Sequence, residues 1–401
     1  MPAGARANLD SRWTILGALF LARTAMGFQF QSIASTAPFL IRDLQAGYAE
    51  IGTLIGLYML PGVLIALPGG LFAGRFNDKS VCAAGLALMM LGGVLIGISH
   101  GYALAFAGRL LSGVGAVLFS LVLTKMVTDW FAGREIVFAM GVLLASWPFG
   151  IALGLLVQGT LAAALGWQAV MHGTAGLCAL ALVLVGAVYR PPPRSVAPIA
   201  VAAPRLALPP LAEMLPAIVA GILWGCFNLA LVIFFSFAPS LMVEHGIAAL
   251  AAASLTSTAL WITMISVPLG GYLVERSGRP DAAIVVFCCV AGLALAALSL
   301  GALPALLCVV IGFSIGPPAG AIMALPARVL SPLNRPTGLG MFYTAYYTVV
   351  AFGPALAGLA RDVSGTAAAA VLFGAALFAA GAPLLWAFAQ LAAALQKGEG
   401  D

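Results

Sequence analysis

The chain has 401 residues, of which 63% are hydrophobic and only 8% are charged, and its formal net charge is +5. Soluble domains have about 45–50% apolar and about 25% charged residues, so this composition excludes an ordinary soluble protein and indicates an integral membrane protein. The basic residues are spread singly between apolar runs rather than gathered in one patch or tail, which argues against a nucleic-acid-binding surface.

Apolar runs separated by charged or Pro/Gly-rich connections predict an all-α membrane protein with twelve transmembrane helices. The runs are continuously apolar, whereas the strands of a membrane β-barrel alternate in polarity. The first run is longer than the apolar core of a signal peptide, so we expect it to be retained as a span. In chain order, the predicted spans cover residues 13–39, 50–73, 81–99, 103–127, 136–161, 167–189, 214–240, 249–273, 281–301, 303–327, 337–359 and 366–392.

Arg23 lies near the middle of the first predicted span. It is roughly ten residues, or about 15 Å, from the start of this span, and the hydrocarbon core of a bilayer is about 30 Å thick. A charge at this depth costs at least about 2.5–3.5 kcal/mol, so an embedded arginine indicates a functional site. The alternative interpretation is an arginine satisfied by backbone carbonyls or polar side chains at a helix break.

No acidic residue is predicted at the depth of Arg23, because all thirteen fall in connections, at span ends or in tails. A proton-coupled exporter of cations normally needs a buried acid, whereas a guanidinium offers a planar fork that matches a carboxylate or similar oxyanion. We therefore interpret Arg23 as the principal binding residue for a small anion. Gln31, eight residues on and about 80° around the helix, is the better placed of the two nearby glutamines. Arg109, near the outer end of span four, is the second embedded arginine. The sequence leaves open whether it binds substrate or packs between helices.

The positions of the charges predict that both termini are cytoplasmic. An even number of spans places the termini on one side, and cytoplasmic connections carry the excess of Lys and Arg. With the N-terminus inside, only Arg42 and Arg361 fall on the outer side. The fourteen basic residues on the inner side are Arg6, Arg12, Arg75, Lys79, Lys125, Arg134, Arg190, Arg194, Arg205, Arg276, Arg279, Arg328, Arg335 and Lys397.

The longest connection is proline-rich and basic, and we expect it to join two six-helix halves. The predicted division is an N-terminal half at 1–189, a cytoplasmic linker at 190–212 and a C-terminal half at 213–401. A repeat supports it: a shift of 201 residues aligns "APFL" at 37–40 with "APSL" at 238–241, and a shift of 203 aligns "FGIAL" at 149–153 with "FGPAL" at 352–356. Two parallel halves are one architecture of secondary transporters, in which the substrate site lies between the halves near the midplane.

The sequence carries no pattern for catalysis or metal binding. The six cysteines lie in or near spans without CxxC spacing, and they are interpreted as core residues. The three histidines fall at connections or near the start of span six, and no nucleophile–base set, HExxH or P-loop sequence occurs. We therefore expect no enzyme activity, no metal and no cofactor.

Two loop sequences resemble the G-x-L-a-D-R-x-G-R-[RK] signature of the Major Facilitator Superfamily of transporters. The loop after span two, "GGLFAGRFNDKS", keeps Gly70 and Arg75 but has Gly74 in place of the acid, for which Asp78 could supply a displaced charge. The loop after span eight, "GGYLVERSGRP", matches better. Its matching residues are Gly271, Glu275, Arg276, Gly278 and Arg279. In the family these loops help clasp the halves on the cytoplasmic side, so the resemblance gives them a conformational role.

Span four carries "GRLLSGVGA", which resembles the family pattern R-x-x-x-G-x-G with Arg109, Gly113 and Gly115. Together with "GLYMLPG" and "GMFYTAYY", the chain resembles the cyanate-permease-like branch. In the family, spans one, four, seven and ten line the cavity, so the resemblance implies further binding residues. These are Trp224 and Asn228 of span seven and Ser314 of span ten, with Tyr343, Tyr346 and Tyr347 of span eleven as candidates for which helix packing is the alternative.

These observations predict a secondary transporter that moves a small anion, an organic carboxylate or similar oxyanion, by alternating access. We expect a monomer in the cytoplasmic (inner) membrane whose partners are a small-molecule anion and the lipid bilayer, with no nucleic acid. The alternative in the same superfamily is a proton-coupled exporter of drugs or metabolites. A receptor or channel on the same fold is a further class, which substrate-independent conductance would reveal.

Overall fold

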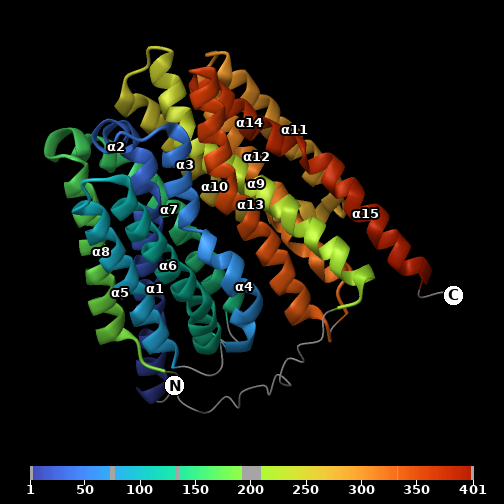
Figure 1. Ribbon diagram of the computed structural model, residues 1–401. Coiled ribbons are helices and arrows are strands. Elements are labelled where there is room, and N and C mark those ends of the chain that lie inside the picture. The colour runs from blue at the N-terminus through green and yellow to red at the C-terminus, as the bar shows by residue number, and fades with distance from the viewer. Residues whose placement is uncertain (1–2, 73–76, 132–134, 192–208, 332, 399–401) are drawn as a thin grey trace. The chain divides into compact units, whose positions relative to one another are not determined.

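The computed structural model describes residues 3–72, 77–131, 135–191, 209–331 and 333–398, and the regular elements in these ranges are all helices. The predicted all-α fold is therefore confirmed. In chain order (Figure 1) the helices are α1 (Ala3–Ser35), α2 (Ala37–Leu44), α3 (Tyr48–Leu57), α4 (Leu60–Phe72), α5 (Asp78–Gly97), α6 (Tyr102–Phe131), α7 (Ile136–Leu165), α8 (Trp167–Val188), α9 (Leu211–Glu244), α10 (Ala249–Ser277), α11 (Pro280–Ser299), α12 (Pro304–Ala324), the 3₁₀ turn η1 (Leu325–Arg328), α13 (Arg335–Ser364), α14 (Ala367–Ala379) and α15 (Gly381–Gly398).

The helices cover each of the twelve predicted spans. Among the described residues, ten helical segments are long and apolar enough to cross a membrane. The first and eleventh predicted spans fall on α1 and α13, which have 33 and 30 residues. Both are longer than the roughly 20 residues that a bilayer requires.

Three predicted spans are interrupted, and a proline follows each interruption closely. Span one ends with α1 and the chain restarts as α2 just before Pro38; span two breaks between α3 and α4 just before Pro61. Span twelve breaks between α14 and α15, just before Pro383. Proline lacks the backbone N–H and crowds the preceding turn, so a helix tends to stop before it and a new one to start at it.

Packing divides the chain into two compact units, residues 1–32 with 71–203 and residues 33–70 with 204–401. The second span, which the repeat assigns to the first half, thus packs within the second unit. The contact between α3 and α13 is close. A Cβ added to Gly52 would lie 2.0 Å from the carbonyl oxygen of Pro354, and one added to Gly56 would lie 1.8 Å from that of Ala351. Small residues of this kind let α3 and α13 approach backbone to backbone. The linker at 190–212 stays a prediction, since residues 192–208 lie outside the described part.

In the first unit, α1 packs on α7. A Cβ added to Gly150 would lie 2.2 Å from the carbonyl oxygen of Thr24 and 2.8 Å from the backbone nitrogen of Phe28, so the two helices meet where only glycine fits. The hydroxyl of Thr24 also donates to the carbonyl oxygen of Ser146 at 3.4 Å. This contact fixes the middle of α1, the part that contains Arg23.

The second unit repeats this contact between α9 and α13. Gly353 lies against Leu229, and these residues are 203 and 201 positions after Gly150 and Phe28. A second equivalent pair joins Gly225 and Val349 here and Thr24 and Ser146 in the first unit. The internal repeat of the sequence is therefore also a repeat of helix contacts.

Candidate functional site

Arg23 lies in the interior of α1, and its side chain is half-buried. From Asp43 to Asp362, each described Asp or Glu lies in the first or last turn of a helix or caps its start. Along the helices, Arg23 is thus separated from these carboxylates, and its binding role stays a prediction. A guanidinium in the interior of a membrane helix attracts groups of negative charge.

Arg109 is completely buried and joins α6 to α1. Its Nη1 donates to the carbonyl oxygen of Gln29 at 3.1 Å and its Nη2 to that of Phe30 at 2.8 Å. The guanidinium carbon lies 5.7 Å from the centre of the Phe30 ring. These contacts are between helices, so the geometry favours packing for Arg109 over the binding role.

Gln158 of α7 binds the carbonyl group of α1 that precedes the two bound by Arg109. The sequence interpretation missed this residue. It is fully buried, and its Nε2 donates to the carbonyl oxygen of Phe28 at 2.7 Å. With Arg109, three consecutive carbonyls of α1, at residues 28 to 30, thus accept side-chain hydrogen bonds. The available signal was a single glutamine in an otherwise apolar stretch, "LLVQGT". This cluster fixes α1 about two turns beyond Arg23.

The two glutamines of α1 are both buried, each 1% exposed. Gln29 donates to the carbonyl oxygen of Met89 on α5 at 2.9 Å. The side chain of Gln31 lies beside Gly154 of α7, where an added Cβ would be 3.0 Å from the Cβ of Gln31. In this structure Gln31 therefore packs at a helix contact, and its binding role stays a prediction.

The second unit brings four predicted aromatic residues together. The ring centres of Trp224 and Tyr346 are 6.4 Å apart, and Tyr346 lies 6.4 Å from Tyr343 and 4.9 Å from Tyr347. Trp224 also stacks on Phe227 at 5.6 Å. The four side chains are half-buried, and together they form an aromatic cluster on α9 and α13.

The predicted polar residues of the second unit bind within their own helices. Asn228 donates to the carbonyl oxygen of Trp224 at 2.8 Å, beside the aromatic cluster. Ser314 is buried in α12 and donates to the carbonyl oxygen of Val310 at 2.7 Å. Both groups already have a local partner, so each would have to exchange that bond to contact a substrate.

Of the loop after span two, Arg75 lies outside the described residues and Gly70 lies near the end of α4. Asp78, in the first turn of α5, pairs with Lys125 of α6, whose Nζ also lies 3.3 Å from Asp129. Lys125 and Asp129, four residues apart on α6, thus form a local ion pair. Asp78 joins that pair and places a carboxylate at this end of the first unit.

Of the loop after span eight, Gly278 has a φ of +64°, a left-handed conformation that suits glycine and ends α10. Glu275 and Arg276 lie in the last turn of α10, where Arg276 donates to the hydroxyl of Tyr272 at 3.3 Å. Gly271 lies earlier on the same helix, and Arg279 precedes α11. The conformational role of both loops stays a prediction.

A polar network at the end of α13, unforeseen from the sequence, connects four helices of the second unit. Arg361 is 7% exposed; its Nη2 donates to Glu244 at 2.7 Å and its guanidinium carbon lies 3.7 Å from the centre of the Tyr48 ring. The other oxygen of Glu244 accepts from the backbone nitrogen of Ala367 at 3.0 Å. Asp362, next in the chain, binds the start of α3. The network therefore joins α3, α9 and α14 to the end of α13.

Comparisons with known proteins agree with this architecture. Residues 19–354 match the sequence model of the Major Facilitator Superfamily. The methylenomycin A resistance protein of Bacillus subtilis is 30% identical over 127 residues, 31% of this chain and 27% of that protein. The uncharacterized MFS-type transporter Rv1250 of Mycobacterium tuberculosis is 26% identical over 160 residues, 39% of this chain and 27% of that protein. These alignments span about a quarter of either relative.

The fold is similar to that of a solved transporter. A bacterial homolog to the human lysosomal transporter Spinster, crystallised in an inward-facing and occupied conformation, superposes with a TM-score of 0.73 at 16% identity. The match covers 96% of this chain and 97% of that one. At this level of identity the similarity supports the fold alone.

Proposed function

Because the chain belongs to the Major Facilitator Superfamily and is a secondary membrane transporter of that family, we propose that its substrate is a small anion bound by Arg23. The substrate class is an organic carboxylate or similar oxyanion. We further propose that it is moved by alternating access in a monomer of the cytoplasmic membrane, with both termini cytoplasmic. The finer resemblance to the cyanate-permease-like branch stays a prediction.

The observation that carries this proposal is the position of Arg23 in the interior of α1, while the acids from Asp43 to Asp362 lie at helix ends. A charge at bilayer depth is retained where it performs a task, and an anion is the partner that this charge attracts. The planar guanidinium suits a carboxylate because two parallel N–H groups can bind its two oxygens.

The surroundings of α1 support the proposal because they fix the helix that presents Arg23. Arg109 and Gln158 bind the carbonyls of three consecutive residues of α1, and Gly150 brings α7 into contact with Thr24. A binding group works best on a rigid element whose own contacts are satisfied. In this interpretation Arg109 positions α1, whereas Arg23 contacts the substrate.

A thermal-shift screen of the purified protein against small carboxylates and inorganic oxyanions tests the proposal. A ligand that binds the folded protein raises its apparent melting temperature by mass action. We expect at least one anion to stabilise the wild-type protein and to lose this effect with Arg23→Gln. Arg23→Lys should retain part of it, because the charge remains while the fork is lost.

The matched control is Arg335→Gln, which removes an exposed arginine at the start of α13, outside both signature loops. It should bind the same anion as the wild type. If the best anion stabilises the wild-type and Arg23→Gln proteins equally, Arg23 is not the binding residue. Uptake of the labelled anion into proteoliposomes, with the same four proteins, distinguishes transport from binding alone.

The second candidate function is a proton-coupled exporter of drugs or metabolites. The aromatic cluster around Trp224 and Tyr346 favours it, because aromatic faces bind flat apolar molecules and organic cations. The name of the Bacillus subtilis relative, a resistance protein, points the same way. Stabilisation by lipophilic cations with no response to small carboxylates would support this function over the first.

A further inference from the structure

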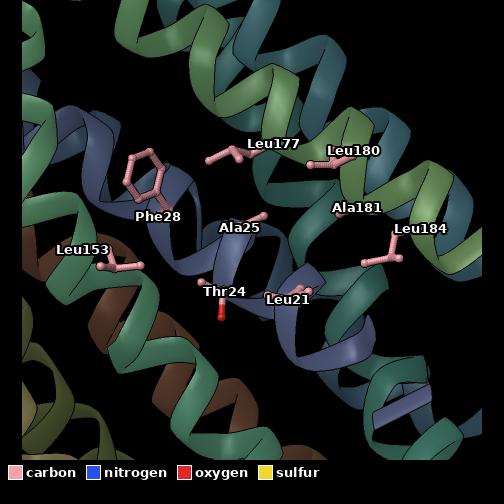
Figure 2. A pocket seen from close by; sticks show the side chains of 9 residues that line it. All are labelled: Leu21, Thr24, Ala25, Phe28, Leu153, Leu177, Leu180, Ala181 and Leu184. Atoms are coloured by element: carbon pink, nitrogen blue, oxygen red, sulfur yellow. The ribbon is translucent and has the colours of Figure 1, made fainter. Parts of the chain in front are cut away.

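A groove lies on the first unit between α1, α7 and α8 (Figure 2). Its volume is about 230 Å³. Leu21 of α1 and Leu180 of α8 are 55% and 64% exposed, so the groove is open along one side. The lining residues are Leu21, Thr24, Ala25, Phe28, Leu153, Leu177, Leu180, Ala181 and Leu184.

The chemistry of the lining excludes a polar ligand. Eight of its nine residues are apolar, and none is charged. The hydroxyl of Thr24 already donates to the carbonyl oxygen of Ser146. A bound water needs two to four polar partners, and a headgroup needs charged or hydrogen-bonding ones. The groove therefore suits hydrocarbon.

The place of the groove in the fold identifies the source of that hydrocarbon. Two of its three walls, α7 and α8, are among the helices long and apolar enough to cross a membrane. The exposed leucines of these walls would face the acyl region of the bilayer. We propose that the groove binds one acyl chain of a membrane phospholipid, held more tightly than the chains around the rest of the unit.

Packing explains why an acyl chain should bind more tightly in the groove than on the rest of the unit's surface. Lipid tails are as apolar as leucine, so burial from water supplies no preference between sites. A concave surface formed by three helices makes more dispersion contacts with a chain than a flat face does, and an empty groove would lose them. A flexible acyl chain can follow its shape.

The bound acyl chain would lie on the face of α1 that is opposite Arg23. The α1 residues of the lining, at positions 21, 24, 25 and 28, share one helix face. At 100° per residue, Arg23 points about 150° away from the centre of that face. The acyl site is therefore separate from the anion site, and it is expected to support α1 from the opposite side.

Photolabelling tests this proposal directly. The protein is reconstituted in nanodiscs that contain a phospholipid with a diazirine in its acyl chain, irradiated and mapped by mass spectrometry. We expect adducts at Leu21 and Leu177 to exceed those at Val183 several-fold. Val183 is a stringent reference because it lies on α8, is 68% exposed and does not line the groove.

Ala181→Phe should fill the floor of the groove and reduce the adducts at Leu21 and Leu177 several-fold. Val183→Phe, which enlarges an exposed residue of the same helix, should leave them unchanged. If Ala181→Phe does not fold, Leu180→Phe replaces it, because a side chain 64% exposed tolerates enlargement.

Three results would overturn the proposal. One is labelling of Leu21 and Leu177 no stronger than that of Val183. Another is labelling that persists in well-folded Ala181→Phe and Leu180→Phe proteins. The third is complete displacement of the labelled phospholipid by an equimolar free fatty acid, which would assign the groove to a different lipid.

Discussion

The carboxylate of Asp362 caps the helix that begins at Tyr48, which lies 314 residues earlier in the chain. One oxygen accepts from the backbone nitrogen of Tyr48 at 2.9 Å, and the other accepts from that of Ala49 at 2.7 Å. The first N–H groups of a helix have no partner within it, and its dipole favours a negative charge there. The end of α13 thus supplies what the start of α3 lacks.

Asp362→Ala should therefore lower the stability of the protein by about 1 kcal/mol, the usual size of a lost helix cap. Asp362→Asn should lose less, because its amide oxygen can still accept one bond. The measurement is the apparent melting temperature in detergent. Asp281→Ala, which removes an exposed partner of Arg328, is the control and should change little. Equal losses for Asp281→Ala and Asp362→Ala would contradict the capping role.

Gly150→Ala should destabilise the first unit by about 1–3 kcal/mol, since the new methyl group would lie 2.2 Å from a backbone oxygen of α1. Gly141→Ala is the matched control on the same helix, because a Cβ there meets no atom within 4 Å. It should be neutral or slightly stabilising, because alanine favours helix. Melting temperatures that fall equally for both variants would show that the contact is not decisive.

Arg109→Lys should lower stability by about 1–3 kcal/mol and leave the anion preference unchanged. Lysine keeps the charge but cannot bind two neighbouring carbonyl groups in the same planar geometry. Arg23→Lys should do the opposite, with little effect on stability and weaker anion binding. Ranking several anions by thermal shift in both variants separates the two arginines. A changed ranking in Arg109→Lys would restore a binding role to that residue.

Tyr189, which follows α8, should make the protein less stable in alkaline solution. Burial, followed by the Asp78 and Asp129 carboxylates, raises the pKa of its hydroxyl above the ordinary value of 10.0. In the unfolded chain the hydroxyl ionises from about pH 10, while the folded protein keeps it neutral. The free energy of unfolding therefore falls as the pH rises above about 10. Tyr189→Phe should remove this loss. The difference in melting temperature between the two proteins at pH 8 and pH 11 measures it.

The spans could be predicted from the sequence because long apolar runs indicate membrane helices. The breaks near Pro38, Pro61 and Pro383 had a local signal too, since proline disfavours helix continuation. The packing of α3 on α13 had none that could be used. Glycines at 52 and 56 indicate close packing but not which helix approaches them, because the partner residues are 302 and 295 positions later in the chain and only the fold brings them together.

For the candidate site, the sequence indicated which residues are unusual but not what they contact. Arg23 and Arg109 are both arginines inside apolar runs, and sequence alone left a binding role and a structural role open for each. The partners of Arg109 are backbone carbonyls of α1. Every residue has such a carbonyl group, so the residue types do not show which ones accept a hydrogen bond. Gln158 was missed for the same reason, because its partner is also a carbonyl group.

The division of the chain has a consequence for how the polypeptide can be cut. Residues 33–70 belong by packing with residues 204–401, although residues 71–203 intervene. A gene split in the proline-rich connection would therefore encode a first fragment whose α3 lacks α13, and a second fragment whose Asp362 has no helix start to cap. Neither polypeptide could complete its packing alone, and each would depend on co-expression with the other.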